Sequence, residues 1–215
     1  MTIDLAQLDP RYFDRMDNLI DSDFYAQPRK VVHIDQGAID AVTALYRELL
    51  PAGSTILDLM SSWRSHLPEE VQYARVCGLG MNEDELSDNP QLSDWLVHNL
   101  NQTPQLPFTD GEFAGVCCCV SVQYMQRPQE VFAEVARIVQ PNAPFVITFS
   151  NRCFPTKAIN LWRSTDDWGH IEVVESYFAL EPGFRHIDQR VYMPSRMDEE
   201  HQDPLYAMWG FRRND

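Results

Sequence analysis

The chain has 215 residues, of which 44% are hydrophobic and 23% charged, a composition typical of one globular domain and not of a disordered chain. Its 17 basic and 32 acidic residues give a formal net charge of -15, which disfavours binding to nucleic acid or to an anionic membrane surface. No apolar run approaches the roughly 20 residues of a membrane helix, and the acidic start differs from a signal peptide. We therefore expect a cytoplasmic protein, monomeric or homodimeric.

Residues 1–35 are expected to form an N-terminal arm or lid. Four aromatic residues are spaced among its aspartates: Tyr12, Phe13, Phe24 and Tyr25. They either pack the arm onto the domain or, over residues 24–29, cover a ligand pocket. Tyr25, Arg29 and His33 are candidate lid or substrate residues, because arginine binds carboxylates in a bidentate way and histidine titrates near neutrality. The alternative for Arg29 and His33 is a solvated surface position.

The main domain, residues 36–215, alternates predicted helices with short apolar strands. Helices are predicted over residues 36–50, with Asp35 as a possible cap, from about 67–70, from about 81–86, over 128–139, near Trp162 and over 172–180. Strands are predicted over 55–59, 75–80, 95–100, 115–120 and 145–149, followed by an antiparallel pair over 185–193 and 205–211. This order predicts an α/β fold with a doubly wound, mostly parallel, seven-stranded Rossmann-like sheet whose last strand is antiparallel.

Three consecutive cysteines, Cys117 to Cys119, occupy the most apolar predicted strand. Neighbouring strand residues point to opposite faces, so these thiols cannot converge on one metal, and we expect reduced core residues. Residues 33–35 and 199–203 contain potential metal ligands without a second pair at a recognised spacing. No metal site is therefore predicted.

Ligands of open α/β sheets bind at the carboxyl ends of the strands, which places candidate site residues at 58–62, after the first strand. Asp58 either contacts a ligand or only caps the following turn. The chain has no nucleophile elbow, no Walker loop and no Gly-x-Gly-x-x-Gly loop. Hydrolase, phosphate-binding and nicotinamide-dependent reductase functions are therefore disfavoured.

Three stretches carry a family resemblance. They are Thr55-Ile56-Leu57-Asp58-Leu59, Leu106-Pro107-Phe108-Thr109-Asp110-Gly111-Glu112-Phe113, and the run from Glu130 to Ala143, in which Glu134, Arg137 and Pro141 match the positions of the family pattern. In this order they resemble the class I S-adenosylmethionine-dependent methyltransferases of the type 11 kind, over about half of the chain. The sequence is similar to a divergent subgroup in which Met60-Ser61-Ser62-Trp63-Arg64-Ser65 replaces the glycine-rich loop. That subgroup also shares Gly-x-Gly-Met-Asn and Ser-Asn-Arg-Cys-Phe.

The resemblance implies S-adenosylmethionine as cofactor and S-adenosylhomocysteine as product. The implied cofactor contacts are Asp58, Met60, Ser61 and Ser62 for the methionine end, Gly80, Met81 and Asn82 for the ribose, Asn99 and Leu100 for the adenine, and Val120 beside the sulfonium. Gly80 stands where the family commonly has an acid that binds both ribose hydroxyls. Tyr124 and Asn151 follow the fourth and fifth predicted strands and are expected on the acceptor side, with the lid residues Tyr25, Arg29 and His33.

The function implied is methyl transfer to a small-molecule acceptor, with no diagnostic catalytic residue, because positioning supplies most of the rate of such a displacement. The alternative is a non-catalytic methyltransferase-like binding or scaffolding domain that has lost the cofactor. A pocket blocked by Trp63 or Arg64 would favour that alternative.

Overall fold

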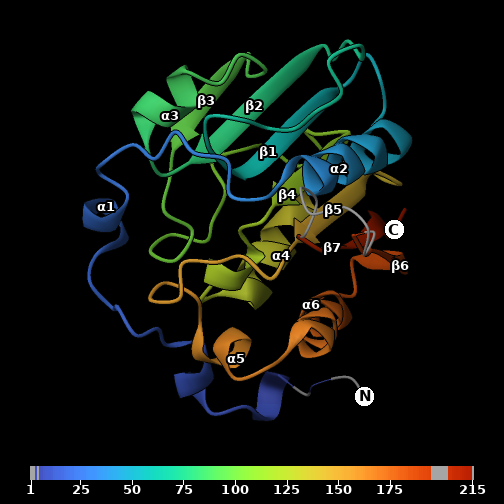
Figure 1. Cartoon of the computed structure of the whole chain (residues 1–215). Helices are drawn as coiled ribbons and strands as arrows, with labels where there is room; N and C mark the ends of the chain where they lie inside the picture. The colour runs from blue at the N-terminus through green and yellow to red at the C-terminus, as the bar shows by residue number, and fades with distance from the viewer. Residues whose placement is uncertain (1–2, 4, 195–202, 215) are drawn as a thin grey trace.

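The computed structural model describes residue 3, residues 5–194 and residues 203–214. Its centre is one seven-stranded sheet with helices on both faces (Figure 1). The strands are β1 (Thr55–Ser61), β2 (Arg75–Gly80), β3 (Asp94–Val97), β4 (Gly115–Cys119), β5 (Pro144–Phe149), β6 (Phe184–Tyr192) and β7 (Leu205–Arg212). The order is β3-β2-β1-β4-β5-β7-β6; β1 to β5 are parallel, and β7 lies antiparallel between β5 and β6. The predicted fold class is confirmed.

Helices cover the two faces of the sheet unequally. The helices are α1 (Asp21–Phe24), α2 (Gln36–Leu49), α3 (Glu83–Ser87), α4 (Pro128–Ile138), α5 (Asn160–Arg163) and α6 (Asp167–Leu180). One face packs against α2, with Val42, Leu45 and Tyr46 fully buried. The opposite face packs against α4, α5 and α6 and holds the larger core cluster (Figure 1). Asp35 caps α2 by accepting a hydrogen bond from Ala38 N, as predicted.

The central strands are buried on both faces, which explains their continuous apolar sequence. In β4, Cys118 packs in the larger cluster and Cys117 in the cluster under α2, as the alternation of strand side chains requires. All five cysteines are free thiols. Among the described residues, no His, Cys, Asp and Glu side chains form a group that could hold a metal ion. Residues 199–202 of the second weak metal candidate lie outside the described residues.

The helix predicted to begin near residues 67–70 is wrong. Residues 62–74, between β1 and β2, form no helix. The carbonyl of His66 accepts from Thr43 Oγ1 at 3.0 Å, and the carbonyl of Leu67 accepts from Gln91 Nε2 at 2.7 Å. Side chains from other elements therefore satisfy the acceptors that helical N–H groups would otherwise use.

Two other boundaries differ from the prediction by three residues or more, and β1 ends two residues later than predicted, at Ser61. Strand β3 ends at Val97 because Asn99 begins a turn, in which its Oδ1 accepts from the N–H groups of Asn101 and Gln102. Helix α6 begins at Asp167, five residues before the predicted start, with Asp166 capping it through Gly169 N. Apolar periodicity misses the first turn of this helix because the one large apolar side chain of that turn, Trp168, is exposed and does not continue the buried face.

Two of the three segments that carry the family resemblance, residues 106–113 and 130–143, bind each other away from the carboxyl ends of the strands. Arg137 on α4 pairs with Glu134 and with Asp110, both at 2.7 Å, and donates to the carbonyls of Leu106 and Phe108. Glu134 in turn accepts from Leu106 N. These residues fasten the loop before β4 to α4, so their role is structural.

Candidate functional site

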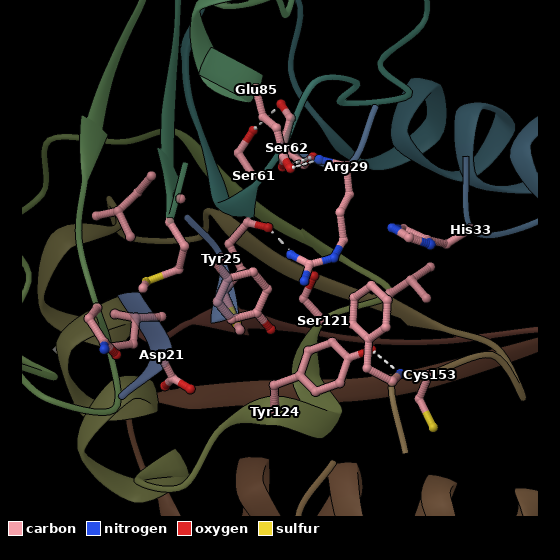
Figure 2. Close-up of a pocket in the computed structure, with 18 of the residues that line it drawn as sticks. Asp21, Tyr25, Arg29, His33, Ser61, Ser62, Glu85, Ser121, Tyr124 and Cys153 are labelled. Atoms are coloured by element: carbon pink, nitrogen blue, oxygen red, sulfur yellow. Dashed lines mark hydrogen bonds between the residues drawn. The ribbon is translucent and has the colours of Figure 1, made fainter. Parts of the chain in front are cut away.

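A cavity of about 360 Å³ lies at the carboxyl ends of the parallel strands. Its size falls within the range of small-molecule sites. Figure 2 shows side chains converging on it from the strand ends and from the N-terminal arm. The lining residues are Asp21, Tyr25, Arg29, Val32, His33, Met60, Ser61, Ser62, Leu79, Gly80, Met81, Glu85, His98, Asn99, Leu100, Asn101, Val120, Ser121, Tyr124, Arg152, Cys153 and Phe154.

Most of the residues proposed from the sequence line this cavity. They are Met60, Ser61, Ser62, Gly80, Met81, Asn99, Leu100 and Val120 from the cofactor set, and Tyr25, Arg29, His33 and Tyr124 from the lid and acceptor set. Asp58, Asn82 and Asn151 do not line it. Asp58 is buried behind the loop, Asn82 caps α3, and Asn151 is exposed next to Ser150, whose Oγ contacts its Oδ1 at 3.4 Å.

Asp58 organises the glycine-free loop after β1. Its Oδ2 accepts hydrogen bonds from Ser61 Oγ at 2.5 Å and from Ser65 Oγ at 2.6 Å. Asn89 Nδ2 extends the network to Ser65 Oγ and to the carbonyl of Ser62. Burial raises the pKa of Asp58 to about 6, and the hydrogen bonds from the two serines and from Cys117 oppose that rise. The loop shape thus depends on a buried carboxylate and hydroxyl donors.

Backbone conformation at two strand ends is unusual. Met60 has φ 59° and Val120 has φ 46°, in the left-handed region that favours glycine. Both residues line the cavity. A β-branched residue at positive φ costs free energy that the surrounding structure must offset, and such residues concentrate at ligand sites. Met60 therefore occupies, in this chain, a conformation that a glycine-rich loop adopts without strain.

Gly80 allows the ends of β1 and β2 to approach closely. A Cβ at this position would lie 2.2 Å from the carbonyl oxygen of Ser61, a distance that no real side chain occupies. The pairing of Ser61 with Gly80 also follows a register shift after Leu59. The glycine is thus required by the neighbouring strand end.

Trp63 and Arg64 leave the cavity open. Trp63 Nε1 donates to the carbonyl of Val31 at 3.0 Å, and the Arg64 guanidinium lies 4.0 Å from the Trp63 ring centroid. Neither residue lines the cavity described above. Trp63 instead contacts the segment before α2 and Arg64 packs on Trp63, so neither produces the blocked pocket that a non-catalytic domain would have.

Glu85, which the sequence analysis missed, supplies a carboxylate near the end of β2. Its Oε1 accepts from Arg29 N at 2.5 Å and its Oε2 from Ser62 Oγ at 2.6 Å. Glu85 is also the third residue after the cap Asn82, whose Oδ1 accepts from Glu85 N. The Asn82-x-x-Glu85 spacing is typical of a helix start, and it is the sequence feature from which the position of Glu85 could have been predicted. It places an acid five residues after the position where the family commonly has one.

The N-terminal arm is fixed by a buried charge cluster, also missed. Asp21 pairs with Arg15 at 2.7 Å and with Lys157 at 3.3 Å, and the Lys157 side chain is fully buried. Lys157 also pairs with Asp17 and donates to the carbonyl of Leu19. Figure 1 shows the arm running from the α5–α6 side past α1 towards α2. These contacts make the arm one wall of the cavity.

Aromatic rings and one guanidinium pack together where the arm meets the segments after β4 and β5. The Arg29 Cζ atom lies 4.2 Å from the centroid of the Phe24 ring and 5.6 Å from that of Phe154. Phe154 also packs edge-on against His33 and stacks near Tyr124. Burial lowers the pKa of His33, so its imidazole is neutral near pH 7. Arg29 therefore carries the fixed positive charge of this wall.

Comparisons with known proteins agree with this fold. A sequence model of the family described as "Methyltransferase domain" matches residues 64–147. The bifunctional biotin biosynthesis protein BioHC of Teredinibacter turnerae is 24% identical over 143 residues, which cover 60% of this chain. The match spans about a quarter, 25%, of the length of that curated relative.

Solved structures share the fold at low identity. Geranyl diphosphate C-methyltransferase from Streptomyces coelicolor, in complex with S-adenosylhomocysteine, aligns with a TM-score of 0.54 and 13% identity over 94% of this chain and 96% of that one. An S-adenosylmethionine-dependent methyltransferase from Mesorhizobium loti aligns with a TM-score of 0.53 and 13% identity over 81% and 100%. The chain therefore has the fold of the class I methyltransferases, and the family model supports the resemblance seen in the sequence over residues 64–147. Over the described ranges, no helix has both the length and the apolar character needed to cross a bilayer.

Proposed function

We propose that this chain transfers a methyl group from S-adenosylmethionine to a small-molecule acceptor. The observation that carries the proposal is the open cavity at the carboxyl ends of β1 to β5, lined by most of the residues that the family resemblance assigns to the cofactor, Asp58 and Asn82 excepted. Bound S-adenosylmethionine supplies an electrophilic methyl group on its sulfonium. The protein then has to bind the two reactants, orient them and exclude water.

The residues present fit such a cofactor. Ser61 and Ser62 present a polar loop for the methionine end, and the absence of a side chain at Gly80 keeps the two strand ends close together. We assign the ribose hydroxyls to Glu85, because a carboxylate has about four acceptor positions and the described contacts of Glu85 use two. Asn99 and Leu100 flank the adenine position, and Val120 lies at the end of β4, beside the position of the sulfonium.

Calorimetric titration of S-adenosylhomocysteine into the protein tests this assignment. We expect a micromolar dissociation constant, about -8 kcal/mol. Glu85→Gln should weaken binding roughly tenfold, since it removes the charge that accepts the ribose hydroxyls. Asp88→Asn is the matched control, because Asp88 lies just after α3, outside the cavity lining, and the change in charge is the same. If millimolar S-adenosylhomocysteine produces no heat of binding, the proposed enzymatic function is contradicted, whereas the fold assignment is unaffected.

A further inference from the structure

The acceptor side of the cavity combines the Arg29 guanidinium with aromatic side chains. It is formed by the arm and by the segments after β4 and β5, and it includes Tyr25, Arg29, Tyr124 and Phe154. The whole chain carries a formal charge of -15, so a cation inside a cavity is contrary to the average field of the protein. Figure 2 shows the Arg29 side chain pointing into the cavity, between Tyr25 and Ser121.

Arg29 has no carboxylate partner for its guanidinium among the described residues. The other arginine that lines the cavity, Arg152, pairs with Asp203 at 2.9 Å. The Arg29 side chain makes one long hydrogen bond, 3.4 Å, from Nη1 to the carbonyl of Gln27. Its contact with the Glu85 carboxylate goes through the backbone N–H, which anchors the residue without using the side chain.

The aromatic contacts hold the guanidinium in a way that leaves its donors free. Rings of Phe24, Tyr25 and Phe154 lie within 5.9 Å of the Cζ atom. A guanidinium attracted to aromatic faces keeps its N–H groups in its own plane, available for a planar, two-oxygen ligand. The group is therefore prepositioned for a bidentate carboxylate.

We propose, on the basis of the proposed function, that Arg29 binds a carboxylate in the cavity and that the methyl acceptor supplies it, so that the acceptor is a small aromatic carboxylic acid. The aromatic residues around Arg29 provide the surface for the ring, and the guanidinium provides the charge. The carboxylate of the cofactor is the other possible source. We assign it instead to the β1 loop, because Arg29 lies among Tyr25, Tyr124 and Phe154 on the acceptor side of the cavity.

The test uses protein saturated with S-adenosylhomocysteine and matched pairs of probes: benzoate with benzamide, 4-hydroxybenzoate with its amide, and cinnamate with its amide. We expect at least one acid to bind at least about tenfold more tightly than its amide. Arg29→Gln should abolish that preference. Lys30→Gln is the matched control, since Lys30 is the neighbouring residue, pairs with Asp88 and does not line the cavity. An acid preference that survives Arg29→Gln, or no binding by any acid, overturns the proposal.

A second arm identifies the source of the carboxylate. S-adenosylhomocysteine and 5′-methylthioadenosine, which lacks the amino acid end, are titrated into the wild type and Arg29→Gln. Unchanged affinity for both supports the acceptor as the source. A selective loss of S-adenosylhomocysteine affinity assigns Arg29 to the cofactor and overturns the proposal, whereas failure of the wild type to bind either compound contradicts the proposed function itself.

If Arg29→Gln does not fold, the wild type provides the readout. The Nε–H signal of Arg29 in a nitrogen-15 spectrum should shift on addition of the acid and stay in place on addition of the matched amide. An unmoved signal overturns the proposal.

Discussion

Ser65 Oγ donates a hydrogen bond of 2.6 Å to Oδ2 of Asp58, seven residues earlier, across the loop that follows β1. Ser61 Oγ donates to the same oxygen. Both serines and the aspartate are buried. A loop without glycine is thus closed around one carboxylate, although Asp58 does not reach the cavity.

Asp58→Ala should lower the free energy of unfolding by about 2 kcal/mol or more, because it leaves two buried hydroxyls without their acceptor. It should also weaken S-adenosylhomocysteine binding, since the loop carrying Ser61 and Ser62 loses its support. Urea unfolding and calorimetry measure the two effects. Ser65→Ala removes one donor and should have a smaller effect on both, so an equal or larger loss in that variant would contradict the network.

Asp58 should also contribute to the pH dependence of stability. Its pKa in the folded protein is raised to about 6 from 3.8, so between these values the folded state holds a proton that the unfolded chain has released. Its stabilising contribution is therefore complete below about pH 4 and lost as the pH rises through about 6. The total change is roughly 3 kcal/mol.

Urea unfolding at several pH values checks this, with Asp58→Asn as the variant that cannot titrate. The free energy of unfolding of the wild type relative to the variant should fall from pH 4 to pH 7 and level off above that. A difference that rises with pH, or does not change, contradicts the assignment.

Gly80→Ala and Gly78→Ala form a matched pair on β2. A Cβ at residue 80 meets the backbone carbonyl of Ser61 at 2.2 Å, whereas one at residue 78 meets the end of the Leu92 side chain at 2.4 Å. A side chain can move aside more easily than a strand end. We expect Gly80→Ala to cost about 3 kcal/mol by urea unfolding and Gly78→Ala clearly less. The reverse order would show that the two strand ends separate readily.

Met60 offers a test of its left-handed backbone. By apolar volume alone, Met60→Val should be tolerated better than Met60→Gly. By backbone conformation the order reverses, because valine at φ 59° is strained and glycine is not. We expect Met60→Val to be about 1–2 kcal/mol less stable than Met60→Gly in thermal or urea unfolding. A more stable valine variant would mean that the loop adopts a different backbone.

Lys157→Met should loosen the arm. The buried ammonium pairs with Asp17 and Asp21, and its loss leaves carboxylates without part of their partner set, at a cost of about 3 kcal/mol. Limited proteolysis should cut the first 30 residues faster. Lys30→Met removes only an exposed ion pair with Asp88 and should change stability by less than about 1 kcal/mol. Equal cleavage rates in the two variants would contradict the role of Lys157.

The sheet could be predicted from the sequence because its central strands are buried on both faces, and such strands are short, continuously apolar runs. Strand β2 matches the predicted bounds at both ends, and β1 and β4 begin where expected. The helix expected after β1 is absent because its carbonyls bind the side chains of Thr43 and Gln91. Such partners are distant in sequence and invisible to a local pattern.

Part of the cavity lining could also be predicted from the order of the strands. Residues directly after a strand, such as Met60, Gly80 and Val120, are placed by the topology alone. Glu85 lines the cavity from the first turn of α3, and its position depends on its contact with Arg29 N. Asp21 lines the cavity from the arm, and its position depends on its ion pairs with Arg15 and Lys157. No regular spacing in the chain encodes those contacts.

The close approach of Gly80 to Ser61 has a consequence for evolution. The glycine that would allow a tight loop after β1 is missing from that loop, while the adjoining end of β2 cannot accept any side chain. The requirement for small residues is thus shared between the ends of β1 and β2. Among homologous sequences, residues 60, 61 and 80 should therefore change together, so that a glycine gained after β1 permits a larger residue at the end of β2.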